Sequence, residues 1–283
     1  MNWISFSLLM FVFSNLLYLL IRKAQTEKIK TSIYSVTMFL IPSIIYLILA
    51  LASGISLLPK FNHLIIIVIT AFLWSYLGNY FSQRGILYAP NLGYSLILQK
   101  SYVMLTTIAA FFLFDSELSL LKIIAILIIV GFSALVSISK EKKKSDTKWV
   151  IFSFGAHLCF AYGSLISKYF LNIGLQPYMY LFYITFIVSL LNIYESRAKK
   201  ISLSLSAKQW IILGGIGISA ALFNLFMQQG YKYAPNPGYV VAINTSSIMS
   251  LTLLSAYIFK DNLSVKKIIG IVGITIGLFV IIF

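Results

Sequence analysis

Long runs of hydrophobic residues, separated by short polar segments, follow one another along the whole chain. A helix needs about 20 predominantly apolar residues to cross a bilayer. Ten runs reach that length, and we predict that each forms a membrane-spanning helix. The predicted spans are Asn2–Ile21, Ile33–Ser53, Leu64–Gln83, Leu92–Phe114, Leu120–Ile138, Trp149–Leu171, Pro177–Tyr194, Gln209–Gly230, Gly238–Phe259 and Val265–Phe283. The predicted fold class is therefore an all-α integral membrane protein with ten transmembrane helices.

A polar motif occurs twice in these spans. Asn79–Tyr94 reads NYFSQRGILYAPNLGY and Asn224–Tyr239 reads NLFMQQGYKYAPNPGY, an offset of 145 positions. Polar and turn residues carry the match, which disfavours chance similarity between apolar helices. Copies with an odd number of spans must be inverted relative to each other, as in many alternating-access transporters. We predict two inverted five-helix repeats, residues 1–139 and 149–283, joined by a basic cytoplasmic linker, residues 140–148.

Composition supports a membrane protein and excludes several other classes. The chain of 283 residues is 60% hydrophobic and 10% charged, whereas a soluble domain has about 25% charged residues. Its net charge of +15 comes from basic residues in the loops, which form no stripe that would bind nucleic acid. The single cysteine, Cys159, excludes an internal disulfide. No HExxH, Walker or GxSxG motif is present, so we predict no enzyme, no cofactor and no metal site.

Loop charges predict the orientation of the spans, because cytoplasmic loops are enriched in Lys and Arg. With the N-terminus outside, the inner loops hold 17 basic residues and the outer loops hold four. The four outer residues are Lys60, Lys122, Lys168 and Lys232, while Lys100 falls within a span. A cleaved signal peptide would have basic residues before its apolar run. Here Arg22 and Lys23 follow it, so we predict a retained first helix in the cytoplasmic membrane and both termini outside.

Ten spans in a five-plus-five duplication, with the proline turn and the short acidic-Leu-Ser step that follows, resemble the drug/metabolite transporter superfamily, EamA type. The step reads Asp115-Ser116-Glu117-Leu118-Ser119 in one copy and Asp261-Asn262-Leu263-Ser264 in the other. The resemblance covers nearly the whole chain. It implies ten helices around a central cavity, with the fifth and tenth at the periphery, and transport of small metabolites without ATP. Characterised members usually keep both termini in the cytoplasm, which differs from the orientation that the charge count predicts.

Lys100 is the foremost candidate for substrate binding, because ionic groups inside a bilayer are costly and tend to be functional. It lies roughly 12 Å along its helix, at 1.5 Å per residue. Its repeat equivalent is Thr245, so the symmetry is broken there, as expected where an asymmetric ligand binds. We hypothesise that Lys100 provides positive charge for an anionic or zwitterionic substrate. The alternative is a lysine whose ammonium group reaches the interface along its apolar stem.

Further polar residues recur in both copies. Asn79 and Gln83 are four residues apart, and therefore share a helix face, as do Asn224 and Gln228. These four residues either line a cavity or hydrogen-bond neighbouring helices. Additional cavity candidates are Gln99 with its equivalent Asn244, and Tyr94 with its equivalent Tyr239, the tyrosines having an interfacial aromatic belt as their alternative.

His157 is a candidate for proton coupling, because it lies near the middle of its span and histidine titrates near neutral pH. The alternative is a neutral histidine bonded to a neighbouring helix. No acid is found within any predicted span. Small multidrug exporters of the same superfamily use a glutamate in their first span, so organic-cation/proton antiport is disfavoured here.

These observations predict a secondary active transporter that moves a small polar metabolite by alternating access. An amino acid, an organic anion or a phosphorylated compound fits Lys100 best. Two alternatives stay open: a transporter of quaternary or other organic amines through an aromatic cage, and a non-transporting scaffold or lipid-modifying protein. The expected partners are a small-molecule substrate and membrane lipid, with no nucleic acid, for a monomer or homodimer.

Overall fold

The computed structural model describes residues 2–89, 92–137, 147–198, 205–260 and 263–283, and its helices form ten membrane-length spans. The first half holds α1 (Trp3–Thr26), α2 (Thr31–Ala52), α3 (Phe61–Thr70), the π-helix η1 (Ala71–Leu77), α4 (Gly78–Tyr88), α5 (Leu92–Lys100), α6 (Tyr102–Phe114) and α7 (Leu120–Ser137). The second half holds α8 (Lys148–Asn172), α9 (Pro177–Ala198), α10 (Ala207–Tyr233), α11 (Pro237–Phe259) and α12 (Val265–Ile282). All ten predicted spans are thereby confirmed, with ends shifted by a few residues.

Two spans of the first half are not continuous α-helices. The third span changes from α3 through η1 to α4, and the fourth is broken at Ser101 between α5 and α6. At this break the carbonyl oxygen of Leu98 accepts a hydrogen bond of 2.8 Å from the Ser101 hydroxyl group. Hydropathy could not reveal either irregularity, because a bent span is as apolar as a straight one.

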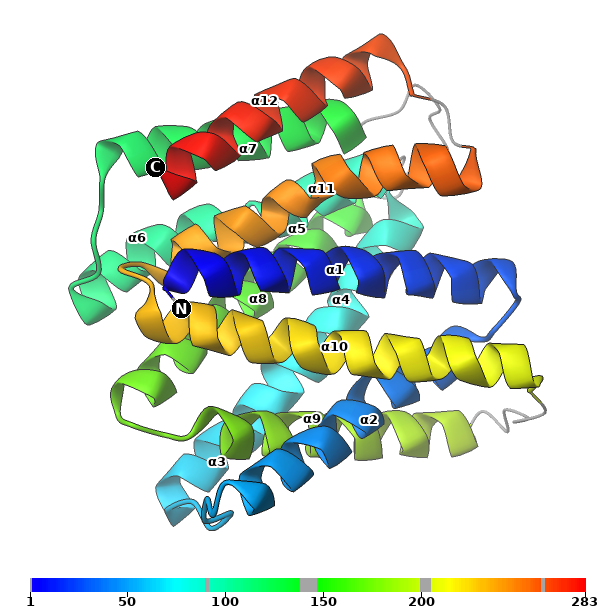
Figure 1. The fold of residues 1–283 in the computed structure, drawn as a ribbon, viewed down its shortest axis with the longest axis vertical. Coiled ribbons are helices and arrows are strands. Elements are labelled where there is room, and N and C mark those ends of the chain that lie inside the picture. The colour runs from blue at the N-terminus through cyan, green and yellow to red at the C-terminus, as the bar shows by residue number, and fades with distance from the viewer. Residues whose placement is uncertain (1, 90–91, 138–146, 199–204, 261–262) are drawn as a thin grey trace.

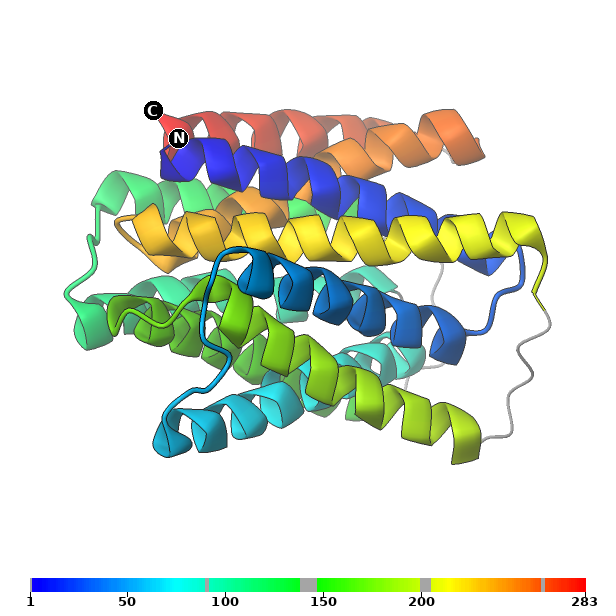
Figure 2. The same ribbon diagram turned by 60° about the horizontal axis from the view of Figure 1, so that its bottom comes forward.

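Both termini lie on one side of the bundle, here called the terminal side (Figures 1 and 2). The α6–α7 loop and the α10–α11 turn lie on this side too, and the α1–α2 loop lies on the opposite side (Figure 1). A chain with an even number of spans has both termini on the same side of the membrane.

The pairs of neighbouring helices are compatible with the predicted inverted repeat. α1 packs along α10, and α4 with η1 packs along α8. Exchanging each span with the span five places along the chain converts the first pair into the second. The same exchange leaves two other pairs unchanged, α2 with α9 and α7 with α12. The last of these pairs lies at the edge of the bundle (Figure 1), where the family resemblance puts the fifth and tenth helices.

Glycines allow α12 to pack closely on α7. A Cβ atom added at Gly277 would lie 3.0 Å from the carbonyl oxygen of Ala125, and one at Gly273 would overlap the ring of Phe132. Small residues at such interfaces bring helices close enough for dispersion contacts to hold them together in lipid.

Three of the four lysines that the charge count assigned to outer loops, Lys122, Lys168 and Lys232, lie instead within helices, and two of them bind the end of another helix. Lys168 is a buried residue of α8, and its Nζ donates to the carbonyl oxygens of Tyr231 at 2.8 Å and Ala234 at 3.2 Å. Lys122 lies on α7 and donates to the carbonyl oxygen of Ile281 near the end of α12. Both ammonium groups bind the carbonyl ends of helices, where positive charge is favourable.

We predict that Gly273→Ala lowers the stability of the bundle by about 1–3 kcal/mol, because the added methyl group forces Phe132 out of its position. Thermal unfolding in detergent measures the change. Gly131→Ala on α7 is the matched control, since its added Cβ meets no atom within 4 Å. Equal melting temperatures for the two variants would contradict this account of the interface.

Candidate functional site

Seven polar or charged side chains from six helices come together, five of them buried in the bundle, and we call them the central polar cluster. They are Ser14 and Tyr18 of α1, Lys100 of α5, Tyr102 of α6, Ser164 of α8, Tyr231 of α10 and Asn244 of α11. Both halves of the chain contribute, which suits a site at the interface between two repeats.

Hydrogen bonds connect the deeper members of the cluster. Ser14 Oγ donates to Asn244 Oδ1 at 3.1 Å, and the hydroxyl groups of Ser164 and Tyr231 are 3.1 Å apart. The Tyr102 hydroxyl group interacts with the side chains of Asn244 and Ser164, which joins the two pairs. All five of these side chains are buried, so the cluster is a polar region enclosed by apolar helices.

Lys100 and Tyr18 form the accessible edge of the cluster. The Nζ atom of Lys100 lies 5.9 Å from the centroid of the Tyr18 ring, within the range of a cation–π contact. The Tyr18 side chain is 42% exposed and Lys100 is partly exposed. Among the residues that the structure describes, no carboxylate or carbonyl oxygen binds this ammonium group. Lys100 therefore differs from Lys168 and Lys122, whose ammonium groups are hydrogen-bonded to helix ends.

Gln99, next to Lys100, is occupied by contacts within the protein. Its Oε1 accepts from Ser82 Oγ at 2.6 Å and its Nε2 donates to Ser95 Oγ at 2.7 Å. Ser95 in turn pairs with Ser153 of α8 at 2.7 Å. This network joins α4, α5 and α8, so Gln99 links helices, whereas its repeat equivalent Asn244 belongs to the central polar cluster.

The duplicated asparagines make the same bond in both repeats. The Nδ2 of Asn79 donates to the carbonyl oxygen of Ser75, and that of Asn224 donates to the carbonyl oxygen of Ala220 at 2.9 Å, each one turn back along its own helix. Both asparagines are partly buried. Their amide groups are engaged locally and belong to neither network above.

The duplicated glutamines differ from each other. Gln83 is exposed, while Gln228 is fully buried and donates from Nε2 to Ser167 Oγ at 3.1 Å. Ser167 also lies 3.1 Å from the Tyr180 hydroxyl group. Within the described part of the chain, the Oε1 atom of Gln228 has no hydrogen-bond partner. The recurring polar face that the sequence suggests therefore points inward only in the second repeat.

His157 binds the break between α5 and α6. Its Nδ1 lies 3.2 Å from the carbonyl oxygen of Leu98 and 3.1 Å from Ser101 Oγ. A carbonyl oxygen only accepts, so Nδ1 must carry a proton in this contact. The ring also stacks on Phe154. The geometry favours the alternative in which His157 is bonded to a neighbouring helix.

The two tyrosines of the repeat motif cannot be compared, because the side chain of Tyr94 lies outside the described residues. Tyr239 is fully buried and does not belong to an exposed aromatic belt. Its hydroxyl group donates to the carbonyl oxygen of Glu117 at 3.2 Å and accepts from the backbone N–H of Ser119 at 3.1 Å. It contacts the α6–α7 loop and not the central polar cluster.

Sequence reasoning missed five members of the cluster: Ser14, Tyr18, Tyr102, Ser164 and Tyr231. A partial signal was available. Ser14 and Tyr18 are four residues apart and share a helix face, as do Ser164 and Lys168. Single serines and tyrosines are nevertheless common in membrane helices, and only their spatial convergence separates these from the others.

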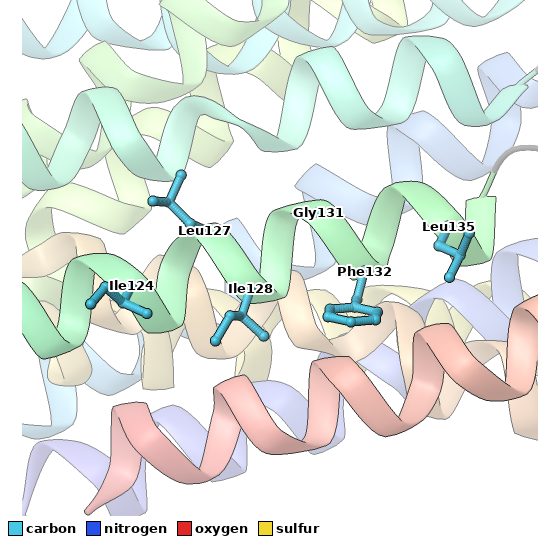
Figure 3. A pocket seen from close by; sticks show the side chains of 6 residues that line it. All are labelled: Ile124, Leu127, Ile128, Gly131, Phe132 and Leu135. Atoms are coloured by element: carbon cyan, nitrogen blue, oxygen red, sulfur yellow. The ribbon is translucent and has the colours of Figure 1, made fainter.

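An apolar groove of about 420 Å³ runs along α7 (Figure 3). It is lined by Ile124, Leu127, Ile128, Gly131, Phe132 and Leu135. Because it offers no polar side chain and lies on a peripheral helix, it suits lipid acyl chains and not a polar substrate.

Comparison with known proteins agrees with this fold. Residues 147–283 match the model of the EamA-like transporter family. Among 29 matching chains of solved structures, one described only as the crystal structure of a protein aligns with a TM-score of 0.83 at 13% identity, over 99% of this chain and 98% of that one. At that identity the likeness shows the fold alone. No curated protein matches the chain.

We predict that His157→Asn keeps the melting temperature of the wild type, because the Asn amide group can still donate near the position of Nδ1. His157→Leu should lower the free energy of unfolding by about 1 kcal/mol. The Leu98 carbonyl oxygen then still accepts from the Ser101 hydroxyl group but loses its hydrogen bond from the imidazole ring. Thermal unfolding at several pH values between 5 and 8 measures both. A pH dependence that disappears in the Asn variant would instead favour a titrating histidine.

Proposed function

Residues 147–283 match the EamA-like transporter family, and we propose that this chain is a secondary active transporter of a small metabolite that carries an anionic group. An amino acid, an organic anion or a phosphorylated compound meets this description. The family consists of membrane transporters of the drug/metabolite type, so the proposal adds the substrate class, the binding residues and the mechanism.

The observation that carries the proposal is the environment of Lys100. A cation inside a span is costly unless something compensates its charge. The other lysines bound inside the bundle, Lys168 and Lys122, are compensated by helix carbonyl groups. Lys100 has a tyrosine ring and an adjoining set of hydroxyl and amide groups, which is the environment that an anionic substrate with further polar groups requires.

In this mechanism the substrate's anionic group binds Lys100, and its other polar groups bind the hydroxyl and amide groups of the central polar cluster. Binding of the substrate must favour the state in which the site is enclosed, because a ligand shifts an equilibrium only by its differential affinity. The two five-helix halves then rock about the site and expose it to each side in turn.

The surroundings of Tyr18 disfavour the aromatic-cage alternative. Tyr18, the accessible aromatic residue of the cluster, already faces the ammonium group of Lys100. A second cation at that ring would be repelled by the lysine. An organic amine therefore lacks a suitable position in the central polar cluster.

We also propose that the protein lies in the cytoplasmic membrane with both termini outside. The inner side then holds 17 basic residues and the outer side four, and this orientation is the one that the positive-inside rule favours.

We predict that anionic or zwitterionic metabolites raise the unfolding temperature of the purified wild type. A ligand at 100 times its Kd stabilises the folded state by about 2.7 kcal/mol. Lys100→Ala should weaken binding roughly 10- to 100-fold, as expected for the loss of a charged hydrogen bond, and Lys100→Arg should retain part of it. Lys232→Ala, an exposed lysine at the end of α10, is the control. An unchanged response in Lys100→Ala would rule out the assigned position of Lys100.

Saturable counterflow in proteoliposomes tests transport itself. We expect a labelled metabolite from the responding class to accumulate transiently against unlabelled metabolite trapped inside, and Lys100→Ala to reduce the rate. Flux that never saturates would indicate a channel, and absence of flux for every responding metabolite would indicate a scaffold or another non-transporting protein.

A further inference from the structure

The α10–α11 turn is bonded to the α6–α7 loop on the terminal side of the bundle. The backbone N–H of Glu117 donates to the carbonyl oxygen of Pro235 at 3.1 Å. The side chain of Asn236 donates to the carbonyl oxygens of Glu117 at 2.9 Å and Thr107 at 3.0 Å. We call this set of contacts, with those of Tyr239, the terminal-side latch.

Asn236 is suited to this position because it uses all of its hydrogen-bonding groups. Its two Nδ2 protons bind two different carbonyl oxygens, and its Oδ1 accepts from the backbone N–H of Gly238 at 2.8 Å as the cap of α11. The residue is fully buried. Aspartate could cap the helix but could not donate to either carbonyl oxygen, and alanine could do neither.

Tyr239, in the first turn of α11, completes the latch. Its hydroxyl group binds Glu117 and Ser119. The centroid of its ring lies 6.4 Å from that of Trp3 and 6.0 Å from the Nζ atom of Lys122. It therefore touches α1, α7 and the α6–α7 loop together. A close approach is possible because Gly238 lies against Thr107, where a Cβ atom would come 2.7 Å from the Thr107 Cα.

Burial is unequal at the repeat-related starts of α11 and α5. Every residue of Val240–Ser247 is buried, at 5% exposure or less. In the repeat-related segment Ser95–Tyr102, only Ser95, Gln99 and Tyr102 are buried. The two segments follow directly on the two copies of the duplicated motif, at the same offset of 145 positions. The bundle is closed around α11 on the terminal side and looser at the start of α5 on the opposite side.

We infer that the terminal-side latch is a gate, and that Asn236 and Tyr239 are positioning residues that hold it shut and release it once in each transport cycle. The inference rests on the proposed transport function but reaches beyond it, because it names the contact that must break. In the alternate state the start of α11 becomes accessible from the terminal side, which opens a route to the central polar cluster.

Thiol labelling tests the gate without a known substrate. Ala242, fully buried, is replaced by cysteine in a Cys159→Ser background, and a membrane-impermeant methanethiosulfonate is added to cells or oriented vesicles from the terminal side. We expect slow labelling with the latch intact. Tyr239→Phe, which removes only the hydroxyl group and its two hydrogen bonds, should speed labelling about 5- to 30-fold, as expected for the loss of one to two neutral hydrogen bonds. Asn236→Ala should speed it further.

Two controls separate opening of the gate from general loosening. Asn172→Ala, at the exposed end of α8 on the same side, should leave the labelling rate unchanged. A cysteine at Ala50, buried on α2 away from the latch, should stay unreactive in the latch variants. The inference is overturned if the latch variants do not speed labelling at position 242, or if they speed it equally at position 50.

A reversible cross-link tests whether the gate must open for transport. Glu117→Cys and Pro235→Cys place two thiols on residues joined by a backbone hydrogen bond, within reach of a short bifunctional methanethiosulfonate. Cross-linking should stop counterflow, and reduction should restore it, while each single-cysteine variant keeps its flux. Continued flux in the cross-linked protein, or failure of the cross-link to form, would overturn the inference. Absence of counterflow in the Cys159→Ser protein alone would instead contradict the proposed function and leave the labelling result standing.

Discussion

The absence of water in the bilayer is the constraint on which this structure depends, because every backbone polar group there must find a partner within the protein. Helix ends and breaks are where partners are lacking. Lys168 supplies donors to the end of α10, Lys122 to the end of α12, and His157 to the break before α6. A titratable side chain inside a span is therefore not by itself a sign of function, since its partner decides what it does.

Lys100 differs from these lysines in the partner of its ammonium group. It is as costly to bury as Lys168, yet a tyrosine ring is the contact that the structure gives it. The buried members of the central polar cluster are hydrogen-bonded to one another, so a substrate at the site that we propose has to exchange those bonds for its own. These internal bonds stabilise the cluster when no ligand is bound. They also limit binding to ligands that replace most of the bonds that are lost.

The two copies of the duplicated motif make some contacts in common and differ in others. Where the repeats agree, as at Asn79 and Asn224, each residue makes the same hydrogen bond to a backbone carbonyl oxygen of its own span. Where they differ, as at Lys100 and Thr245, one copy provides a charge and the other a hydroxyl group bonded within its own helix. The terminal-side latch lies beyond the cluster, between it and the terminal side, so the gate that we propose is separate from the groups to which we assign substrate binding.

The sequence by itself determined the ten spans, the duplication and the candidacy of Lys100, because hydropathy, polar motifs and the cost of a buried charge are properties of the chain alone. Only the tertiary structure decided the rest. Gln99 and Asn244 are repeat equivalents, yet one links helices and the other joins the cluster. Tyr239 binds a loop and Lys168 a helix end. These outcomes depend on which residues from distant spans face each other, and the periodicity of one helix carries no information about the face that its neighbour presents.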